Sequence, residues 1–134
     1  MISTLLVDDD IAVLELFRTV LQMDGFEVDV ATSAAQAIPI LGRKSYQIII
    51  TDLRMETSTA GFDVVRAAVR LEPRPLVVVV TAYPVPAAEW RKTGADALFI
   101  KGANTMALSG QLKELLKQTT RSESASGIPL RRVH

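Results

Sequence analysis

Short apolar runs in this sequence are followed, at four places, by side chains that can take part in polar chemistry. These side chains are, in chain order, Asp8, Asp9 and Asp10 after residues 5–7, Asp52 after 48–50, Thr81 after 76–80 and Lys101 after 98–100. Carboxylates brought together repel one another unless a cation neutralises them, and oxygen ligands without His or Cys favour a hard cation such as Mg²⁺. A carboxylate with a caged Mg²⁺, a hydroxyl and an ammonium group supplies the parts for phosphoryl transfer to an aspartate.

Each of these residues, taken alone, also has a purely structural interpretation. Acidic residues between a strand and a helix commonly cap the helix, and Asp9 or Asp10 could do only that. An isolated threonine is typical of a turn, and an isolated lysine is usually solvated. The placement of all of them after successive apolar runs is harder to explain structurally, and it favours the chemical interpretation.

The elements that must position these side chains follow from an alternation of apolar runs with segments of helical periodicity. Strands are predicted at residues 5–7, 28–30, 48–50, 76–80 and 98–100, and helices at 10–23, 33–43, 61–71, 86–93 and 104–118. The continuous apolar runs of the third and fourth strands are typical of strands that helices cover on both faces. Gly25 and Gly94 are predicted helix stops, Thr32 or Ser33 a helix N-cap, and Pro39 should kink or shorten the second helix.

Five strands alternating with five helices predict an α/β fold with a parallel sheet covered by helices on both faces. Right-handed crossovers and the short chain favour an open, doubly wound sheet. In such sheets the ligand site lies at the carboxyl ends of the strands, beside the point where the strand order reverses. We therefore expect the carboxylates, Thr81 and Lys101 to converge at that edge.

Composition excludes several classes of protein. The 134 residues fit one domain, the formal net charge of zero gives no basic field for nucleic acid, and there is no cysteine. The single histidine, His134, is the last residue, which argues against a histidine triad or zinc site. No apolar run is long enough to cross a membrane and no secretory signal is apparent, so a cytoplasmic location is expected. A change in composition after Thr119 predicts a domain at 1–119 and a disordered tail or linker stub at 120–134.

The motifs around the polar residues resemble those of the response-regulator receiver family of two-component signalling. The matching segments are residues 6–9, 50–55, 80–82 and 100–101, together with Gly61 and Gly94–Ala95, within a similarity that spans about residues 2–118. As a set, these motifs are highly specific. The resemblance implies a (βα)5, flavodoxin-like fold with strand order 2-1-3-4-5.

The resemblance also implies a phosphorelay role for the polar residues. Asp52 would accept a phosphoryl group from the phosphohistidine of a sensor histidine kinase or histidine phosphotransfer protein, in a reaction that needs Mg²⁺, for which Mn²⁺ can substitute. The metal would be held by Asp9, Asp52 and the Arg54 main-chain carbonyl directly, and by Asp8 through water. Lys101 and Thr81 would hold phosphoryl oxygens.

The partners implied by the resemblance are proteins. The chain would signal through phosphorylation-dependent binding to an unidentified downstream protein rather than act as an enzyme, and it would contact no membrane. Receivers often pair through their fourth and fifth helices, so a homodimer through those helices is left open. A DNA-binding role needs a second domain with a basic recognition helix, which residues after 119 do not provide, so no nucleic acid is expected to bind through this domain.

The sequence departs from the family in the parts that report phosphorylation. Glu56 stands where proline is common, and the loop from Glu56 to Ala60 is one residue longer than usual. Gly102 replaces a cis-proline after the lysine, so a trans peptide bond is predicted there. Leu98 is aligned with the aromatic switch residue, with Phe99 beside it. These departures predict a weakened or rerouted switch, or alternatively a receiver-like docking module that acts without phosphorylation.

Three further side chains carry weaker predictions. Arg54 and Tyr83 lie two residues after Asp52 and Thr81, where bulky groups obstruct the attacking water, so a long-lived phosphoryl group is predicted. Trp90 is expected to be partly exposed, as part of a partner surface with Tyr83 or as ordinary helix packing.

Overall fold

The computed structural model describes residues 1–82, 85–102 and 105–126, with side chains described as far as Thr119. Its strands are β1 (Ile2–Val7), β2 (Phe26–Ala31), β3 (Ile48–Asp52), β4 (Leu76–Thr81) and β5 (Ala97–Ile100). Its helices are α1 (Ile11–Met23), α2 (Ala34–Leu41), α3 (Ala60–Val69), α4 (Ala87–Arg91) and α5 (Leu108–Ser126), the last preceded by the 3₁₀ turn η1 (Thr105–Ala107). The predicted alternation of strands and helices is therefore confirmed. Tyr83 and the prediction attached to it lie outside the described residues.

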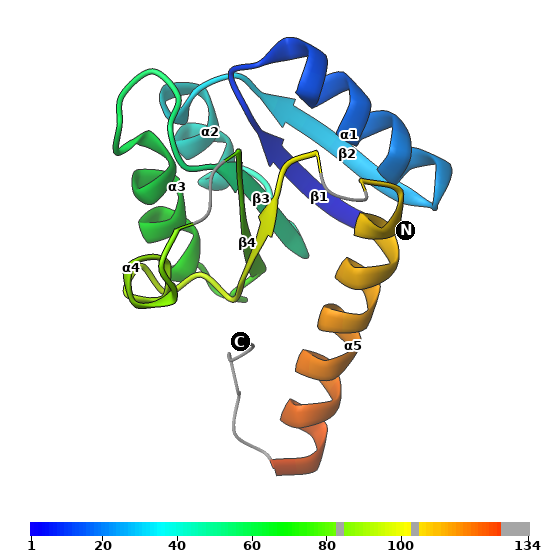
Figure 1. The fold of residues 1–134 in the computed structure, drawn as a ribbon. Coiled ribbons are helices and arrows are strands. Elements are labelled where there is room, and N and C mark those ends of the chain that lie inside the picture. The colour runs from blue at the N-terminus through cyan, green and yellow to red at the C-terminus, as the bar shows by residue number, and fades with distance from the viewer. Residues whose placement is uncertain (83–84, 103–104, 127–134) are drawn as a thin grey trace.

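The sheet is parallel, and its five strands follow the order β2-β1-β3-β4-β5 (Figure 1). After β1 the chain moves outward to β2 and then returns to form β3 on the other side of β1. The pairing of Val7 with Thr51 places the ends of β1 and β3 side by side, and the pairing of Thr81 with Ile100 does the same for β4 and β5. The carboxyl ends of these four strands therefore form one edge, at the point where the strand order reverses.

Helices cover both faces of the sheet, with α1 and α5 on one face and α2, α3 and α4 on the other (Figure 1). Successive side chains of a strand point to opposite faces, so Leu5 and Val7 pack toward α2 and α3 while Leu6 packs toward α1. Ile49 and Ile50 divide between the two faces in the same way. Burial on both faces explains why the β3 and β4 runs are apolar without interruption.

The second helix shows how local sequence sets an element's limits. Its N-cap is Ser33, whose Oγ accepts a hydrogen bond of 3.0 Å from the Gln36 N–H. Pro39 has no N–H to donate to the preceding turn, and the helix continues only to Leu41. The helix is thus shorter than the predicted 33–43. Gly25 and Gly94, the predicted helix stops, have φ angles of +89° and +95°, which favour glycine.

The last helix is longer than predicted. Its helical backbone runs to Ser126 rather than ending at 118, and it extends beyond the end of the sheet (Figure 1). Residues 120–126 contain neither glycine nor proline, so nothing in their sequence interrupts the helix. Residues 127–134 lie outside the described residues, and the domain boundary at 119 stays a prediction. Among the described helices, α5 included, none has the length and apolarity that a bilayer span requires.

Trp90 lies in the core rather than on the surface. Only 6% of the residue is exposed, and it packs in the cluster between the sheet and helices α2, α3 and α4. The expectation of partial exposure was therefore wrong, and of the two interpretations offered for Trp90, helix packing is correct. The short helix α4 has few residues that face the sheet, and the large indole ring fills that space.

Candidate functional site

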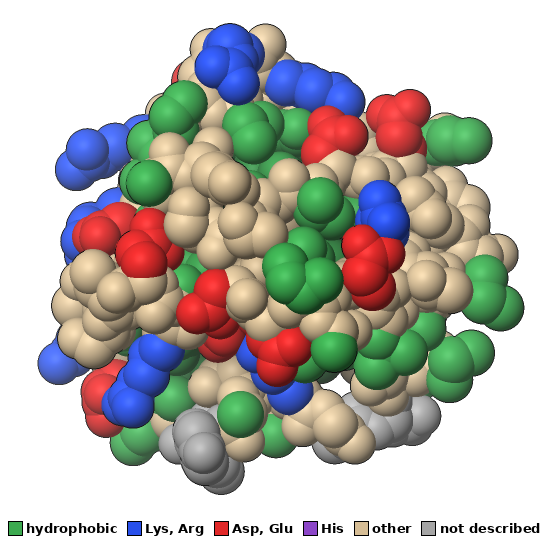
Figure 2. Space-filling model, turned by 90° about the horizontal axis from the view of Figure 1, so that it is seen from above, with side chains coloured by type: hydrophobic (Ala, Val, Ile, Leu, Met, Phe, Trp, Pro, Cys, Tyr) green, Lys and Arg blue, Asp and Glu red, His purple; other side chains and the backbone are tan. Residues whose placement is uncertain are grey.

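Three carboxylates meet where β1 and β3 end. Asp8, Asp9 and Asp52 each offer an oxygen, and these oxygens all lie within 4.8 Å of one another. Asp8 is only 3% exposed, Asp52 is half-buried and Asp9 is exposed. Figure 2 looks onto this end of the molecule and shows acidic side chains near the middle of the face, with basic ones beside them. The predicted convergence of these residues is therefore present.

Lys101 joins two of the carboxylates. Its Nζ lies 2.7 Å from Asp8 Oδ2 and 2.9 Å from Asp52 Oδ2, and its side chain is 15% exposed. Its backbone N–H donates a 2.7 Å hydrogen bond to the Thr81 carbonyl, which fixes the end of β5 against β4. The lysine is thus held by its strand and by its charge partners, and it supplies one positive charge to three carboxylates.

Burial and charge act in opposite directions on the pKa values of this site. Burial raises the pKa of the Asp8 carboxyl, and the hydrogen bonds from Lys101 and the Asp10 backbone only partly offset it. For Lys101, burial alone lowers the pKa, but the hydrogen bonds and charges of Asp8 and Asp52 outweigh it, so the pKa is raised. The lysine therefore stays charged at neutral pH.

Backbone groups orient the two carboxylates that contact Lys101. Asp8 Oδ1 accepts a 2.9 Å hydrogen bond from the Asp10 N–H, and Asp52 Oδ1 accepts one of 2.7 Å from the Leu53 N–H. In each carboxylate one oxygen is held by the chain and the other faces the lysine. This arrangement fixes the direction of both groups before any ligand binds.

Asp10 has a different role from its two neighbours. Its Oδ1 accepts hydrogen bonds from the Ala12 N–H at 3.1 Å and the Val13 N–H at 3.3 Å, so it is the N-cap of α1. The sequence left either Asp9 or Asp10 as a possible cap. Asp10 takes that role, and Asp9 belongs to the carboxylate cluster.

Thr81 and Arg54 line a hollow next to the ends of β3 and β4. The hollow has a volume of about 360 Å³, and its walls come from the loop after β3, the start of α3, the end of β4 and α4. Thr81 is buried at the end of β4, whereas Arg54 is exposed. Thr81 follows Val80, which pairs with Asp52, so Thr81 lies at the same end of the sheet as the carboxylates, as predicted. The role predicted for the Arg54 main-chain carbonyl stays a prediction.

Gly61 allows α3 to pack against the end of β3. Its N–H donates a 2.9 Å hydrogen bond to the Leu53 carbonyl. A Cβ on Gly61 would lie 2.1 Å from the Asp52 carbonyl oxygen and 2.4 Å from Leu53 Cα, which is closer than atoms can approach. Only glycine fits here, which gives a physical reason for the glycine of this motif.

Glu56 makes a contact that the sequence did not predict. Its Oε1 and Oε2 accept hydrogen bonds of 3.0 Å each from the N–H groups of Ala34 and Ala35, at the start of α2. The sequence marked Glu56 only as a departure from the family pattern. The sequence could not predict this contact, because the donors are backbone N–H groups, which nearly every residue type has.

The residues of β5 that depart from the family lie on different faces of the sheet. Leu98 packs against the core that contains Trp90, whereas Phe99 packs against the opposite core. Phe99 therefore cannot take the place of an aromatic residue at 98. The Lys101–Gly102 peptide bond is trans, as predicted, since within the described ranges the cis bond is Glu72–Pro73.

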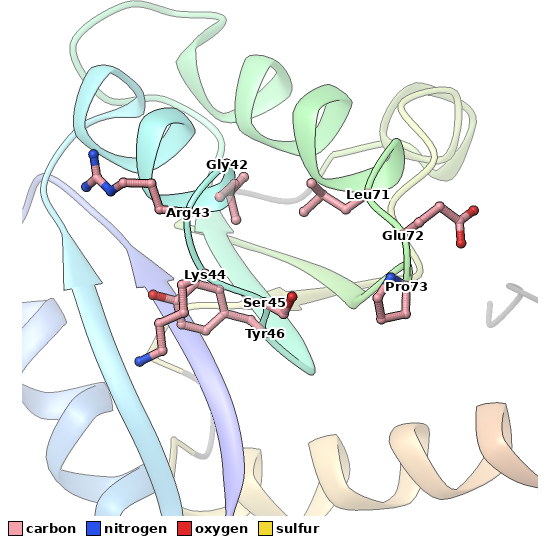
Figure 3. Close-up of a pocket in the computed structure, with 9 residues that line it drawn as sticks. Gly42, Arg43, Lys44, Ser45, Tyr46, Leu71, Glu72 and Pro73 are labelled. Carbon is pink, nitrogen blue, oxygen red and sulfur yellow. The ribbon is translucent and has the colours of Figure 1, made fainter.

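A second hollow lies at the opposite edge of the sheet. It has a volume of about 270 Å³ and is formed by the segment after α2 and the segment after α3 (Figure 3). The charged ends of Arg43 and Glu72 point away from it, and the ring of Tyr46 forms part of its wall. The hollow lacks converging charged groups, so it does not compete with the carboxylate edge as a candidate site.

The comparisons with known proteins agree with this geometry. The family model for the response regulator receiver domain matches residues 4–113. The alginate biosynthesis transcriptional regulatory protein AlgB of Pseudomonas putida is 42% identical over 80 residues, covering 59% of this chain and 17% of that protein. The transcriptional regulatory protein ZraR of Klebsiella oxytoca is 30% identical over 125 residues, covering 92% of this chain and 28% of that protein. The chain spans less than a third of the length of these relatives.

Solved structures show the same likeness over the whole fold. A CheY-like response regulator receiver domain protein from Methanospirillum hungatei gives a TM-score of 0.81 at 25% identity, covering 91% of this chain and 98% of that one. The response regulator protein TrrA of Thermotoga maritima, in complex with Mg²⁺ and BeF, gives a TM-score of 0.76 at 25% identity, covering 85% and 98%. The resemblance read from short motifs therefore extends to the entire architecture.

Proposed function

Because this chain belongs to the response regulator receiver domain family, we propose that it accepts a phosphoryl group on Asp52 in a Mg²⁺-dependent reaction. Receiver domains are signalling modules of two-component systems, and they interact with histidine kinases or phosphotransfer proteins. The donor here is the phosphohistidine of such a partner, and the phosphorylated chain signals by binding another protein. The observation that carries the proposal is the sharing of Lys101 between Asp52 and Asp8, with Asp9 in the same cluster.

The residues present fit a magnesium ion. The oxygens of Asp8, Asp9 and Asp52 are mutually within 4.8 Å, and a hard cation that keeps some of its waters suits such a donor set. Asp9, Asp52 and the Arg54 carbonyl would hold the ion directly, and Asp8 through water. The chemistry that the ion supplies when bound is neutralisation of charge on phosphoryl oxygens. The Mg²⁺ and BeF bound to the related TrrA support this choice of metal.

In the transfer step, a carboxylate oxygen of Asp52 attacks the phosphorus atom of the phosphohistidine. A bond forms between that oxygen and phosphorus while the phosphorus–nitrogen bond breaks, and its electron pair stays on the imidazole nitrogen. The Lys101 ammonium, already 2.9 Å from Asp52 Oδ2, pairs with a phosphoryl oxygen, and the Thr81 hydroxyl donates a hydrogen bond to another. The hydrogen bond from the Leu53 N–H to Asp52 Oδ1 keeps the attacking carboxylate oriented during the transfer.

The proposal is tested by incubating the protein with acetyl phosphate, with and without Mg²⁺, and locating the modified residue by mass spectrometry. A single phosphoryl group on Asp52 is expected, only when Mg²⁺ is present, and Asp52→Asn should abolish it. Asp63→Asn is a matched control, since Asp63 lies on α3, its side chain is 42% exposed and it pairs with Arg66. Labelling that persists in Asp52→Asn, or that is the same with and without Mg²⁺, would contradict the proposal.

A second candidate function is a receiver-like docking module that acts without phosphorylation. Leu98 at the switch position favours it, because a leucine cannot reproduce the rotation of an aromatic ring and Phe99 lies on the other face. The same labelling experiment separates the two candidates, since a docking module does not require modification of Asp52. That the chain forms a homodimer through α4 and α5, and that it binds a downstream protein, are further proposals.

A further inference from the structure

Glu56 links the loop after the acceptor strand to the beginning of α2. The first N–H groups of a helix have no partner within the helix. In α2 the Gln36 N–H is paired with the Ser33 Oγ, while the N–H groups of Ala34 and Ala35 are paired with the two carboxylate oxygens of Glu56. The first turn of α2 is therefore completed by a side chain from a distant loop.

This contact is more than the helix needs in order to form. Ser33 already caps α2, and the N-cap residues of α3 and α4, Thr59 and Pro86, make no side-chain capping bond at all. Two helices of this fold, α3 and α4, thus begin without such help. What the Glu56 contact adds is a fixed distance between the loop and α2, with both carboxylate oxygens engaged by separate donors.

The loop carries the acceptor site at its other end. Glu56 follows Asp52 and Arg54 closely in the chain, and the loop closes through the hydrogen bond from the Gly61 N–H to the Leu53 carbonyl. Met55, which precedes Glu56, packs against the core beneath α2 and α3. The path from Asp52 to α2 therefore runs through a short segment that is anchored at Leu53, Met55 and Glu56, with little slack between these points.

We propose that Glu56 is a positioning residue that couples the carboxylate edge to α2, so that Mg²⁺ binding at Asp9 and Asp52 is linked to the first turn of that helix. The inference rests on the proposed function in requiring that Mg²⁺ binds there. A shift of the loop toward the ion moves Glu56 against the Ala34 and Ala35 amides. Because coupling between two sites is reciprocal, removing the Glu56 contact weakens Mg²⁺ binding.

The test is a titration of the ¹⁵N-labelled chain with MgCl₂ at constant ionic strength, followed by amide NMR shifts. In the wild type, the Ala34 and Ala35 amides should shift with the same dissociation constant as the residues around Asp52. In Glu56→Ala that constant should rise about tenfold, within the usual range of coupling between sites. Glu56→Gln, which keeps one carbonyl acceptor, should give a smaller rise of about fivefold, at the lower end of that range.

Glu27→Gln serves as the matched control, because Glu27 is an exposed glutamate on β2, away from the site. It should leave the dissociation constant unchanged. If Glu56→Ala does not fold, Glu56→Gln alone decides the matter. A wild type that binds Mg²⁺ without shifting the Ala34 and Ala35 amides, or Glu56 variants with unchanged affinity, overturns the inference and leaves the proposed function intact. A wild type that does not bind Mg²⁺ overturns both.

Discussion

The two edges of the sheet each hold a buried acid–base cluster, and the two clusters differ in their balance of charge. At the beginning of β5, Asp96 Oδ2 lies 2.9 Å from Arg74 Nη1 and accepts a 2.8 Å hydrogen bond from the Val77 N–H. Arg74 also donates to the Gly94 carbonyl at 2.6 Å, so one acid faces one base. At the end of the same strand, Lys101 is shared between Asp8 and Asp52, and Asp9 adds a third carboxylate to that cluster.

This difference distinguishes a cluster with a structural role from the candidate site. The Arg74–Asp96 pair joins the segment before β4 to the segment before β5, and its charges cancel without any added ion. The carboxylate edge has more acidic than basic groups, and a bound cation would neutralise the excess negative charge. A group of buried charges that does not balance is the stronger indication of a ligand site.

Breaking the balanced pair should have the largest effect on stability. Asp96→Ala leaves the guanidinium of Arg74 and the Val77 N–H without their shared partner, and we expect the free energy of unfolding to fall by about 3–5 kcal/mol. Urea denaturation measures this loss, which Mg²⁺ should not change. Asp63→Ala, which breaks an exposed pair on α3, should cost less than about 1 kcal/mol. A loss of similar size in both variants would show that the Arg74–Asp96 pair stabilises the fold no more than an exposed pair does.

Removing the lysine at the other edge should give a loss that depends on Mg²⁺. Lys101→Ala leaves Asp8 and Asp52 facing each other without a cation, and we expect a loss of about 2 kcal/mol in EDTA, between the values for exposed and buried pairs. Saturating Mg²⁺ should recover part of it, because the ion neutralises the same carboxylates. Lys113→Ala, which removes an exposed pair with Asp24, is the control. A loss that Mg²⁺ leaves unchanged would argue against the charge imbalance.

The smallest expected effect concerns an ion pair outside both clusters. Hydrogen bonds from Lys44 and Tyr46 lower the pKa of Asp29, whose side chain is 41% exposed. With the folded-state pKa below the ordinary 3.8, the folded state binds fewer protons, so the contribution to stability is present above that pH and is lost as the pH falls through the folded pKa. Asp29→Asn should therefore lower the free energy of unfolding by about 0.5 kcal/mol at pH 7, because such exposed pairs contribute little. Below the folded-state pKa of Asp29 the substitution should have no effect. Equal differences between the wild type and the variant at pH 7 and pH 2.5 would contradict this.

The sequence predicted the sheet and the convergence of its polar residues because both follow from strong local patterns. Apolar runs marked the strands, and the rule for parallel sheets placed Asp52 and Lys101 at one edge although they are far apart in the chain. The strand order itself came from the resemblance to receivers. The strands and helices that follow from the hydrophobic pattern could thus be predicted from the sequence alone.

The features that the sequence did not predict depend on contacts between distant segments. Glu56 accepts a hydrogen bond from the backbone of α2, and Arg74 donates one to Asp96. The local periodicity of the sequence predicts neither contact. Trp90 was expected to be partly exposed because a single aromatic residue on a short helix gives no periodic signal. The sequence predicts too early an end for α5, because the polar composition after Thr119 is typical of a linker, whereas Ser, Glu and Arg also permit a helix to continue.

The unfolding free energies of the wild type and Asp9→Asn, each measured with and without Mg²⁺, test directly whether the clustered carboxylates form a cation site. Without Mg²⁺, Asp9→Asn should be as stable as the wild type or more stable, because it relieves repulsion among the carboxylates. With Mg²⁺ at a hundred times the dissociation constant, the wild type should gain about 2.7 kcal/mol and the variant clearly less. An equal gain in both proteins, or a loss of stability in Asp9→Asn without the metal, would show that the carboxylates do not form such a site.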